Sequence, residues 1–136
     1  MRQAERGDVP AVLALWARER SGHASVADRP EDLEQLVAAS PAALLVAERD
    51  DEIVGALIAA WDGWRGNMYR LAVSEECRHA GVGTALVGAG EDYLRNRGAQ
   101  RVTALVAFDD DVAGGFWDAV GYPRDHEIGR RVRNLD

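Results

Sequence analysis

The sequence predicts an α/β protein in which helices cover the faces of one mixed β-sheet. Strand-like and helix-like segments alternate along the 136 residues in the order β-α-α-β-β-β-α-β-α-β, and no linker or repeat divides them, which indicates a single domain over 1–136. Three consecutive strand-like segments in the middle favour antiparallel hairpins. A later strand–helix–strand segment favours a parallel crossover pair, so we expect an antiparallel N-terminal half followed by a parallel pair.

The first half of the chain carries the signals of an edge strand, two helices and a hairpin. Val9, Val12 and Trp16 recur at helical spacing behind Asp8, a residue type that caps helices. The charged cluster at 49–52 is typical of a hairpin turn. The expected segments are an edge strand at 1–4, a helix over 9–20, a second helix that starts near Pro30 and stops before Pro41, and strands at 44–48 and 53–61.

The second half predicts two further helices, each closed by a glycine. Apolar residues 82, 86, 89 and 93 share one helical face, and Gly98 follows where a left-handed C-terminal cap belongs. Asp109–Asp111 place negative charge at the start of the other helix, which Gly121 closes. The expected segments are a strand at 67–73, a helix over 82–97, a strand at 101–107, a helix from 109–111 to Gly121, and a last strand at 127–135.

Composition and charge exclude several classes of protein. The formal net charge of −7 is a poor match to nucleic-acid phosphates or to anionic lipid. No apolar stretch approaches a membrane span, and the first ten residues lack a signal-peptide core, so we expect a cytoplasmic protein that binds neither membrane nor nucleic acid. Cys77 is the only cysteine, which excludes an internal disulfide and a paired-cysteine zinc site, and we expect no metal.

The most informative segment is the run from residue 71 to residue 86. A strand leads into a glycine-bearing loop that opens a helix, so unpaired main-chain N–H groups point outward at the positive end of a helix dipole. Gly81 and Gly83 lack the β-carbons that would hold a phosphate away from the backbone, and Arg78 adds a charged side chain beside them. Neither a dinucleotide fingerprint nor a P-loop fits, so the segment predicts a pyrophosphate cradle of another type.

Two spaced motifs make a family resemblance specific. The first is Leu71-Ala72-Val73 followed by Arg78-x-x-Gly81-x-Gly83-x-x-Leu86. The second is Asp110-x-x-Ala113-x-x-Phe116-Trp117-x-x-x-Gly121-Tyr122. The first resembles the acetyl-CoA signature of the GNAT superfamily of N-acetyltransferases, and the second is similar to a later motif of that family. The resemblance implies a central mixed sheet of about six to seven strands with about four flanking helices, and a parallel strand pair that splays apart at the CoA site.

The resemblance also implies roles for the residues that match the motifs. The main chain of 71–73 pairs with the pantetheine arm like an added strand, and amides from 78 to 84 hold the pyrophosphate of acetyl-CoA. Asp110 lies near the pantetheine or the leaving group. The CoA-binding residues implied in this way are Leu71, Ala72, Val73, Arg78, His79, Ala80, Gly81, Val82, Gly83, Thr84, Asp110, Ala113, Phe116 and Trp117.

The sequence departs from the family pattern at the catalytic groups. Trp117 stands where the family frequently has a tyrosine acid, and an indole N–H has no suitable pKa for that role. Another group protonates the thiolate, the step goes unassisted, or catalysis has been lost. Strand alternation places Tyr69 on the face of Leu71 and Val73, where it could hold a relay water or simply pack on the sheet. A backbone N–H near Val73 is the expected oxyanion donor.

The acceptor site is less clearly marked than the CoA site. Trp61, Asp62 and Trp64 lie on the turn before the strand at 67–73, and they would attract an amine by charge and cation–π contact. A plain hairpin tip is the alternative interpretation of the same residues. The segment Arg20–Arg29 is expected to form part of the acceptor wall.

The motifs predict an acetyl-CoA-dependent N-acetyltransferase, in which a primary amine attacks the thioester directly in a ternary complex. The amine belongs to a small molecule or a peptide N-terminus. The alternative is an acyl-CoA-binding sensor or regulatory module with weak or no catalysis, favoured by Trp117 and by the lack of a carboxylate in 65–73. A third possibility is a structural domain whose glycines only serve turns. The resemblance further implies a homodimer.

Overall fold

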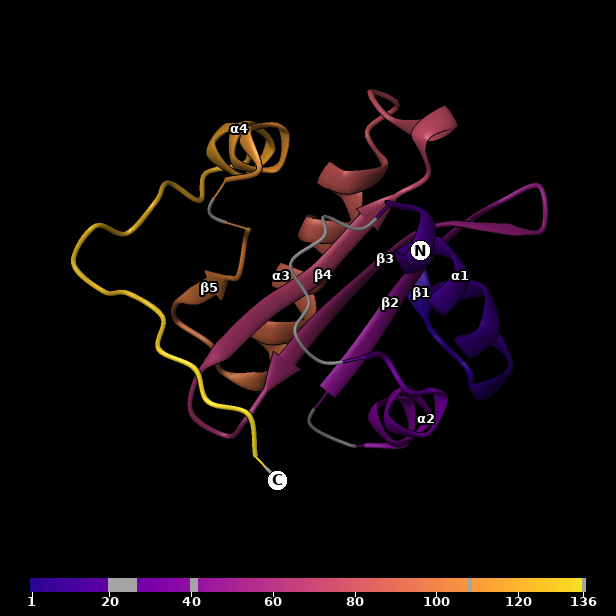
Figure 1. Ribbon diagram of the computed structural model, residues 1–136, viewed down its shortest axis with the longest axis horizontal. Helices are drawn as coiled ribbons and strands as arrows, with labels where there is room; N and C mark the ends of the chain where they lie inside the picture. Colours follow the sequence, from indigo (N-terminus) through magenta and orange to yellow (C-terminus); the bar gives the residue numbers. More distant parts are fainter. Residues whose placement is uncertain (20–26, 40–41, 108, 136) are drawn as a thin grey trace. The chain divides into compact units, whose positions relative to one another are not determined.

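A mixed five-stranded sheet in the order β1-β2-β3-β4-β5 is the framework of the described chain (Figure 1). The structure is a computed structural model that describes residues 1–19, 27–39, 42–107 and 109–135. Strands β1 to β4 pair antiparallel, and β5 pairs parallel to β4. The strands are β1 Arg2–Gln3, β2 Ala42–Arg49, β3 Glu52–Trp61, β4 Gly66–Val73 and β5 Val102–Ala104.

The described chain has four α-helices, distributed between two compact units. One unit comprises Met1–Arg20 with Asp28–Leu105 and contains the whole sheet, and the other comprises Ser21–Ala27 with Val106–Asp136. The helices are α1 Val9–Glu19, α2 Pro30–Ala38 and α3 Val82–Arg97 in the first unit and α4 Asp111–Ala119 in the second, and short 3-10 turns occur at Arg6–Asp8 (η1) and Glu75–Cys77 (η2).

The predicted architecture and most element boundaries are confirmed. The N-terminal part of the sheet is antiparallel, and the strand pair on either side of α3 is parallel. Helix α3 ends at Arg97, and Gly98 follows it in the left-handed conformation with φ 106°. Helix α1 matches the helix expected over 9–20 as far as Glu19, while residue 20 lies outside the described part of the chain.

The described strands are fewer than the about six to seven expected. The strand expected at 101–107 is limited to Val102–Ala104, and residues 127–135 form no strand. Ile128, Val132 and Leu135 in that segment are 77%, 71% and 91% exposed. Ile128 and Val132, four residues apart, would share one face of an extended chain and Leu135 would lie on the other, but all three side chains are exposed. The prediction of a last strand at 127–135 was wrong, because this segment pairs with no strand of the described sheet and buries none of these side chains.

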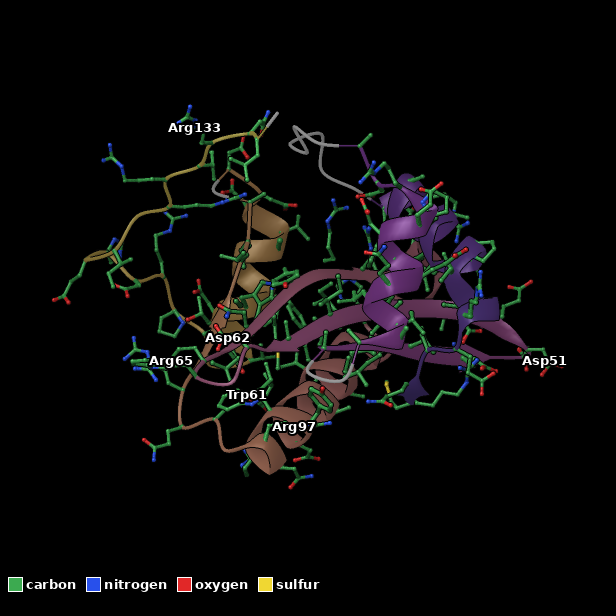
Figure 2. All side chains as sticks on the ribbon, turned by 90° about the horizontal axis from the view of Figure 1, so that it is seen from below. Asp51, Trp61, Asp62, Arg65, Arg97 and Arg133 are labelled. Carbon is green, nitrogen blue, oxygen red and sulfur yellow. The ribbon has the colours of Figure 1, made fainter. Side chains whose placement is uncertain are left out.

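Helices cover both faces of the sheet. Figure 2 shows α3 on one side of the strands and α1 and α2 on the other. The face toward α1 and α2 forms a buried cluster in which Val12, Trp16 and Leu33 meet Val46 and Ala56 of the sheet. Because each helix buries its apolar stripe against the strands, the sheet is the rigid element from which the neighbouring loops project.

Glycines allow α3 to approach the opposite face closely. A β-carbon at Gly90 would lie 2.7 Å from Met68 Cε, and one at Gly55 would lie 2.8 Å from Leu86 Cδ1. Such distances are shorter than real β-carbons adopt, so a side chain at either glycine would force Met68 or Leu86 to move from its present position. The start of α3 is thereby fixed against β3.

Neither a membrane span nor a metal centre is found in the described part of the chain. No helix there combines the length and the apolar character needed to cross a bilayer. No group of three or more His, Cys, Asp or Glu side chains among these residues is arranged to hold a metal ion.

Candidate functional site

The loop between β4 and α3 brings main-chain donors to one end of the sheet (Figure 1). Ser74 N–H donates to the Val54 carbonyl at 2.7 Å and anchors the start of this loop on β3. The turn η2 follows, and Gly81 then adopts φ 83°, a left-handed conformation that favours glycine. Helix α3 starts at the next residue, so the loop and the helix N-terminus form one continuous structure.

Three main-chain N–H groups at the start of α3 are left without a partner in the helix. The first α-helical bond runs from Ala85 N–H to the Gly81 carbonyl at 3.0 Å, so the N–H groups of Val82, Gly83 and Thr84 precede it. No side chain of the described residues caps this N-terminus, and a β-carbon built at Gly81 would meet nothing within 4 Å. Unshielded N–H groups at the positive end of a 16-residue helix are donors of the kind that can bind an anion.

Other predicted donors of the loop are engaged within the protein. Arg78 N–H donates to the Glu75 carbonyl at 3.3 Å, and Ala80 N–H donates to the Cys77 carbonyl at 3.4 Å. Within 78–84, the N–H groups with no main-chain acceptor in the described chain are therefore those of His79, Gly81, Val82, Gly83 and Thr84. Cys77 itself is buried.

The Arg78 side chain is held by a residue that the sequence did not point to. Its Nη2 lies 2.6 Å from Glu19 Oε2 at the end of α1, and Glu19 Oε1 accepts the Glu75 N–H at 3.3 Å. The Glu19 side chain is 11% exposed and the Arg78 side chain 45% exposed, so the guanidinium keeps open sides toward solvent. Nothing in the sequence pattern connects residues 59 positions apart, which is why Glu19 was missed.

A β-bulge interrupts β4 beside this loop. Ala56 pairs with Ala72 and Ile58 with Tyr69, so two residues of β4, Arg70 and Leu71, stand opposite one residue of β3. Arg70 is the bulged residue, with φ 60°. A left-handed conformation at a residue with a β-carbon costs about 1–2 kcal/mol, which the surrounding contacts have to offset.

The bulge overturns the predicted common face of Tyr69, Leu71 and Val73. Tyr69 packs on the cluster beneath α1 and α2, and so does Ala72, three residues later. Val73 pairs with Gly55, whose missing β-carbon points at α3, and therefore belongs to the opposite face. The extra residue at Arg70 shifts the alternation by one position, and the simple count failed for that reason.

The parallel pair of β4 and β5 ends halfway along β4. The last residue pair joins Met68 to Ala104, and Leu105 N–H donates to the Met68 carbonyl at 2.9 Å. In an antiparallel ladder, hydrogen-bonded residue pairs alternate with pairs that share no hydrogen bond. Ser74 N–H donates to the Val54 carbonyl of β3, so the next pair, Gly55 with Val73, is one that shares no hydrogen bond. The Val73 N–H accordingly points away from β3, toward the edge where pairing with β5 has ended.

The Tyr69 hydroxyl is a weak acid in this position. Burial raises the pKa of the half-buried Tyr69 phenol above its ordinary value. The group is therefore protonated at neutral pH and acts as a hydrogen-bond donor rather than as a base.

The turn with the predicted acceptor residues lies at the other end of β4. Figure 2 shows Trp61, Asp62 and Arg65 together at this turn, and Asp51 at the opposite end of the sheet. One Asp62 carboxylate oxygen accepts the N–H groups of Trp64 and Arg65, both at 2.7 Å. The hydrogen bond from Arg65 N–H lowers the pKa of Asp62 most, and the one from Trp64 N–H lowers it further. The Asp62 carboxylate thus stabilises the turn, and the Trp64 side chain is 71% exposed beneath the Arg65 guanidinium.

The second motif forms a capped helix within the second unit. Asp110 is the N-cap of α4, and its Oδ1 accepts the Ala113 N–H at 2.9 Å, which explains the spacing of these two residues by helix capping. Trp117 is buried, and its ring meets Phe116 and Tyr122 edge-to-face at 5.5 and 5.1 Å between centroids. The CoA contacts expected of these residues stay a prediction. Of the segment Arg20–Arg29, residues 20–26 lie outside the described chain.

Comparisons with known proteins identify the family of the chain. The model of the acetyltransferase (GNAT) family matches residues 9–122. An acetyltransferase of Pectobacterium atrosepticum is 34% identical over 116 residues, which cover 85% of this chain and 81% of that protein.

Solved structures show the same fold over nearly the whole chain. The apo aminoglycoside 6'-N-acetyltransferase AAC(6')-IG of Acinetobacter haemolyticus superposes with a TM-score of 0.79 at 18% identity, covering 99% of this chain and 98% of that one. AAC(6')-Iy in complex with a bisubstrate analogue of CoA and acetylneamine superposes with a TM-score of 0.77 at 19% identity, covering 98% and 97%. At these identities the likeness establishes the fold.

Proposed function

The chain belongs to the GNAT family of acetyltransferases, and from this premise we propose that it moves the acetyl group of acetyl-CoA to a primary amine. The observation that supports this reaction best is the set of unpaired N–H groups at 82–84. Arg78, in the loop that leads into them, adds a guanidinium. A diphosphate is the part of CoA that such a group of donors fits.

The open edge of β4 supports the second half of the proposal. Beyond Met68, the described part of β4 pairs with β3 alone, so its other edge has main-chain groups available to an extended pantetheine arm. The Val73 N–H points to this edge and is our candidate donor to the oxyanion that forms when the amine attacks the thioester. Ternary-complex attack needs orientation and charge stabilisation but no covalent enzyme intermediate.

Proton transfers are assigned to a relay rather than to one strong acid. The protonated Tyr69 hydroxyl is a candidate to orient a water between the ammonium and the solvent. Trp117 has no proton to give to the leaving thiolate at neutral pH, so the thiolate leaves unassisted or with a proton from water.

The acceptor is an amine of a small molecule or a peptide N-terminus. The chain's net charge of −7 favours a cationic acceptor over an acidic one. Aminoglycosides, after which two structurally similar acetyltransferases are named, are one such class. The homodimer and the cytoplasmic location expected from the sequence remain part of the proposal, and sedimentation is the test of the former.

Release of CoA thiol tests the reaction. The wild-type chain is assayed with acetyl-CoA and a panel containing an aminoglycoside, a polyamine and a peptide with a free N-terminus, and CoA binding is measured by calorimetry in parallel. We expect saturable thiol release with at least one amine. Tight CoA binding without turnover on any amine would instead favour the acyl-CoA-binding module, and no binding at all would contradict both.

A further inference from the structure

Arg70 occupies a conformation that an arginine rarely adopts inside a strand. Its φ of 60° lies in the left-handed region, and it is the residue that makes the bulge in β4. Strained backbone of this kind persists only where neighbouring groups hold it, and it concentrates at functional positions. The contacts around Arg70 therefore decide whether the bulge is incidental.

Two elements far from β4 in sequence hold this residue. Trp16 Nε1–H of α1 donates to the Arg70 carbonyl at 3.0 Å, and the Arg70 guanidinium lies 5.3 Å from the centroid of the Trp16 ring. Both guanidinium Nη atoms donate to the Asp28 carboxylate, at 2.7 and 3.0 Å. This ion pair is partly buried, with side chains 31% and 23% exposed, so solvent screens it less than a surface pair. We call these three residues the Arg70 clamp.

The clamp holds the part of β4 that changes face. Before Arg70 the strand turns Tyr69 toward α1 and α2, and after it Val73 belongs to the face of α3. If Arg70 relaxed to an ordinary extended conformation, the bulge would disappear and the strand would pair without an extra residue. The side chains between Arg70 and the Ser74–Val54 hydrogen bond would then exchange faces. The Val73 N–H would then no longer point to the open edge.

We propose that Arg70, Asp28 and Trp16 are positioning residues of acetyl transfer, which keep the bulge in place so that the Val73 N–H meets the thioester oxygen. This role rests on the proposed function, because it matters only if the thioester lies at the open edge of β4. The diphosphate loop has its own anchors in the Ser74–Val54 hydrogen bond and the Arg78–Glu19 pair. Loss of the clamp should therefore affect turnover far more than CoA binding.

Two substitutions of Arg70 separate backbone geometry from side-chain contact. Arg70→Ala removes the ion pair but keeps a β-carbon that opposes φ 60°, whereas Arg70→Gly removes the ion pair and accepts that φ without strain. We expect Arg70→Ala to lower kcat about tenfold or more, with a CoA Kd within about threefold of wild type. Arg70→Gly should retain kcat within about threefold. Arg95→Ala, which breaks the exposed Arg95–Asp92 pair on α3 away from the site, is the matched control and should change neither.

Hydrogen exchange supplies a readout that needs no acceptor. Peptides covering 69–73 should exchange faster in Arg70→Ala than in Arg70→Gly or in the control. The inference is overturned if Arg70→Ala keeps wild-type turnover and exchange, or if Arg70→Gly loses as much as Arg70→Ala. If Arg70→Ala does not fold, Asp28→Asn takes its place, and unchanged exchange at 69–73 there has the same meaning. If the wild-type protein binds CoA but acetylates no amine, that result contradicts only the proposed function. Hydrogen exchange at 69–73 in the variants then tests whether the clamp holds the bulge.

Discussion

The two loops at the ends of β4 differ in what their main-chain donors bind. At the β3–β4 turn, the Asp62 carboxylate already accepts the N–H groups of Trp64 and Arg65. At the β4–α3 loop, the N–H groups of 82–84 have no acceptor in the described chain, and no side chain caps the helix. Both loops contain a glycine with positive φ and an exposed arginine, so their compositions look alike.

The difference teaches how to separate a turn from a binding site. A loop whose donors are satisfied by its own side chains is complete without a ligand, because a second acceptor would have to displace the first. A helix N-terminus whose donors face open space is complete only with water or an anion. The β4–α3 loop is of the second kind, and the arginine and glycine substitutions below each have a partner in the other loop.

Reversing the charge at Arg78 should have the largest effect. Arg78→Glu removes a charge-assisted donor and places a carboxylate beside the diphosphate, so we expect the CoA Kd to rise about 30-fold or more. Arg65→Glu makes the same change at the β3–β4 turn and should leave the Kd within about twofold. Calorimetric titration of both variants measures this, with Arg78→Gln as a milder variant that avoids repulsion from Glu19. Equal losses in the two variants would mean a general charge effect rather than a site.

A β-carbon at the left-handed glycines should have a smaller, split effect. Gly81 and Gly63 have φ 83° and 92°, and a β-carbon at either meets nothing within 4 Å. Alanine at each position should therefore lower the free energy of unfolding by about 1 kcal/mol, through backbone strain alone. Only Gly81→Ala should also weaken CoA, by about threefold to tenfold, because it tilts the donors at 82–84. Denaturant unfolding and calorimetry are the measurements, and a weaker CoA complex in Gly63→Ala would break the comparison.

Acid titration of the β3–β4 turn should give the smallest effect. The pKa of Asp62 in the folded chain is lowered, so the stability it contributes is present above the ordinary carboxyl pKa and is lost as pH falls through the folded value. The small difference in Tm between wild type and Asp62→Asn should therefore be constant near neutral pH and shrink below about pH 4. Thermal melts across that range test this, and a difference that grows on acidification would contradict it. CoA affinity at neutral pH should be the same in both proteins.

The sequence was sufficient for those parts of the molecule that depend on local signals. Gly98 marks the end of α3 because the left-handed position that closes a helix favours glycine. The structure accordingly ends α3 at Arg97. Pro30 with two acidic residues after it marked the start of α2 in the same way. The glycine-bearing loop before α3 was visible because its donors and its helix are neighbours in sequence.

Features that depend on distant contacts were not predictable. An arginine in a left-handed conformation has no local signal, since Trp16 and Asp28 stabilise it only after the chain has folded. Counting alternate residues across Arg70 therefore placed Tyr69 on the wrong face. The partnership of Glu19 with Arg78 was invisible for the same reason. The segment at 127–135 was wrongly predicted as a strand, because its apolar residues look strand-like in sequence but are exposed and pair with no described strand.

A titration of the ¹⁵N-labelled chain with CoA tests the central claim most directly. Main-chain amide signals report both loops in a single experiment, without an acceptor amine and without a substitution. We predict that the amides of Val82, Gly83 and Thr84 shift progressively and saturate, while those of Trp64 and Arg65 stay in place. Saturable shifts at Trp64 and Arg65 with unchanged signals at 82–84 would contradict the account.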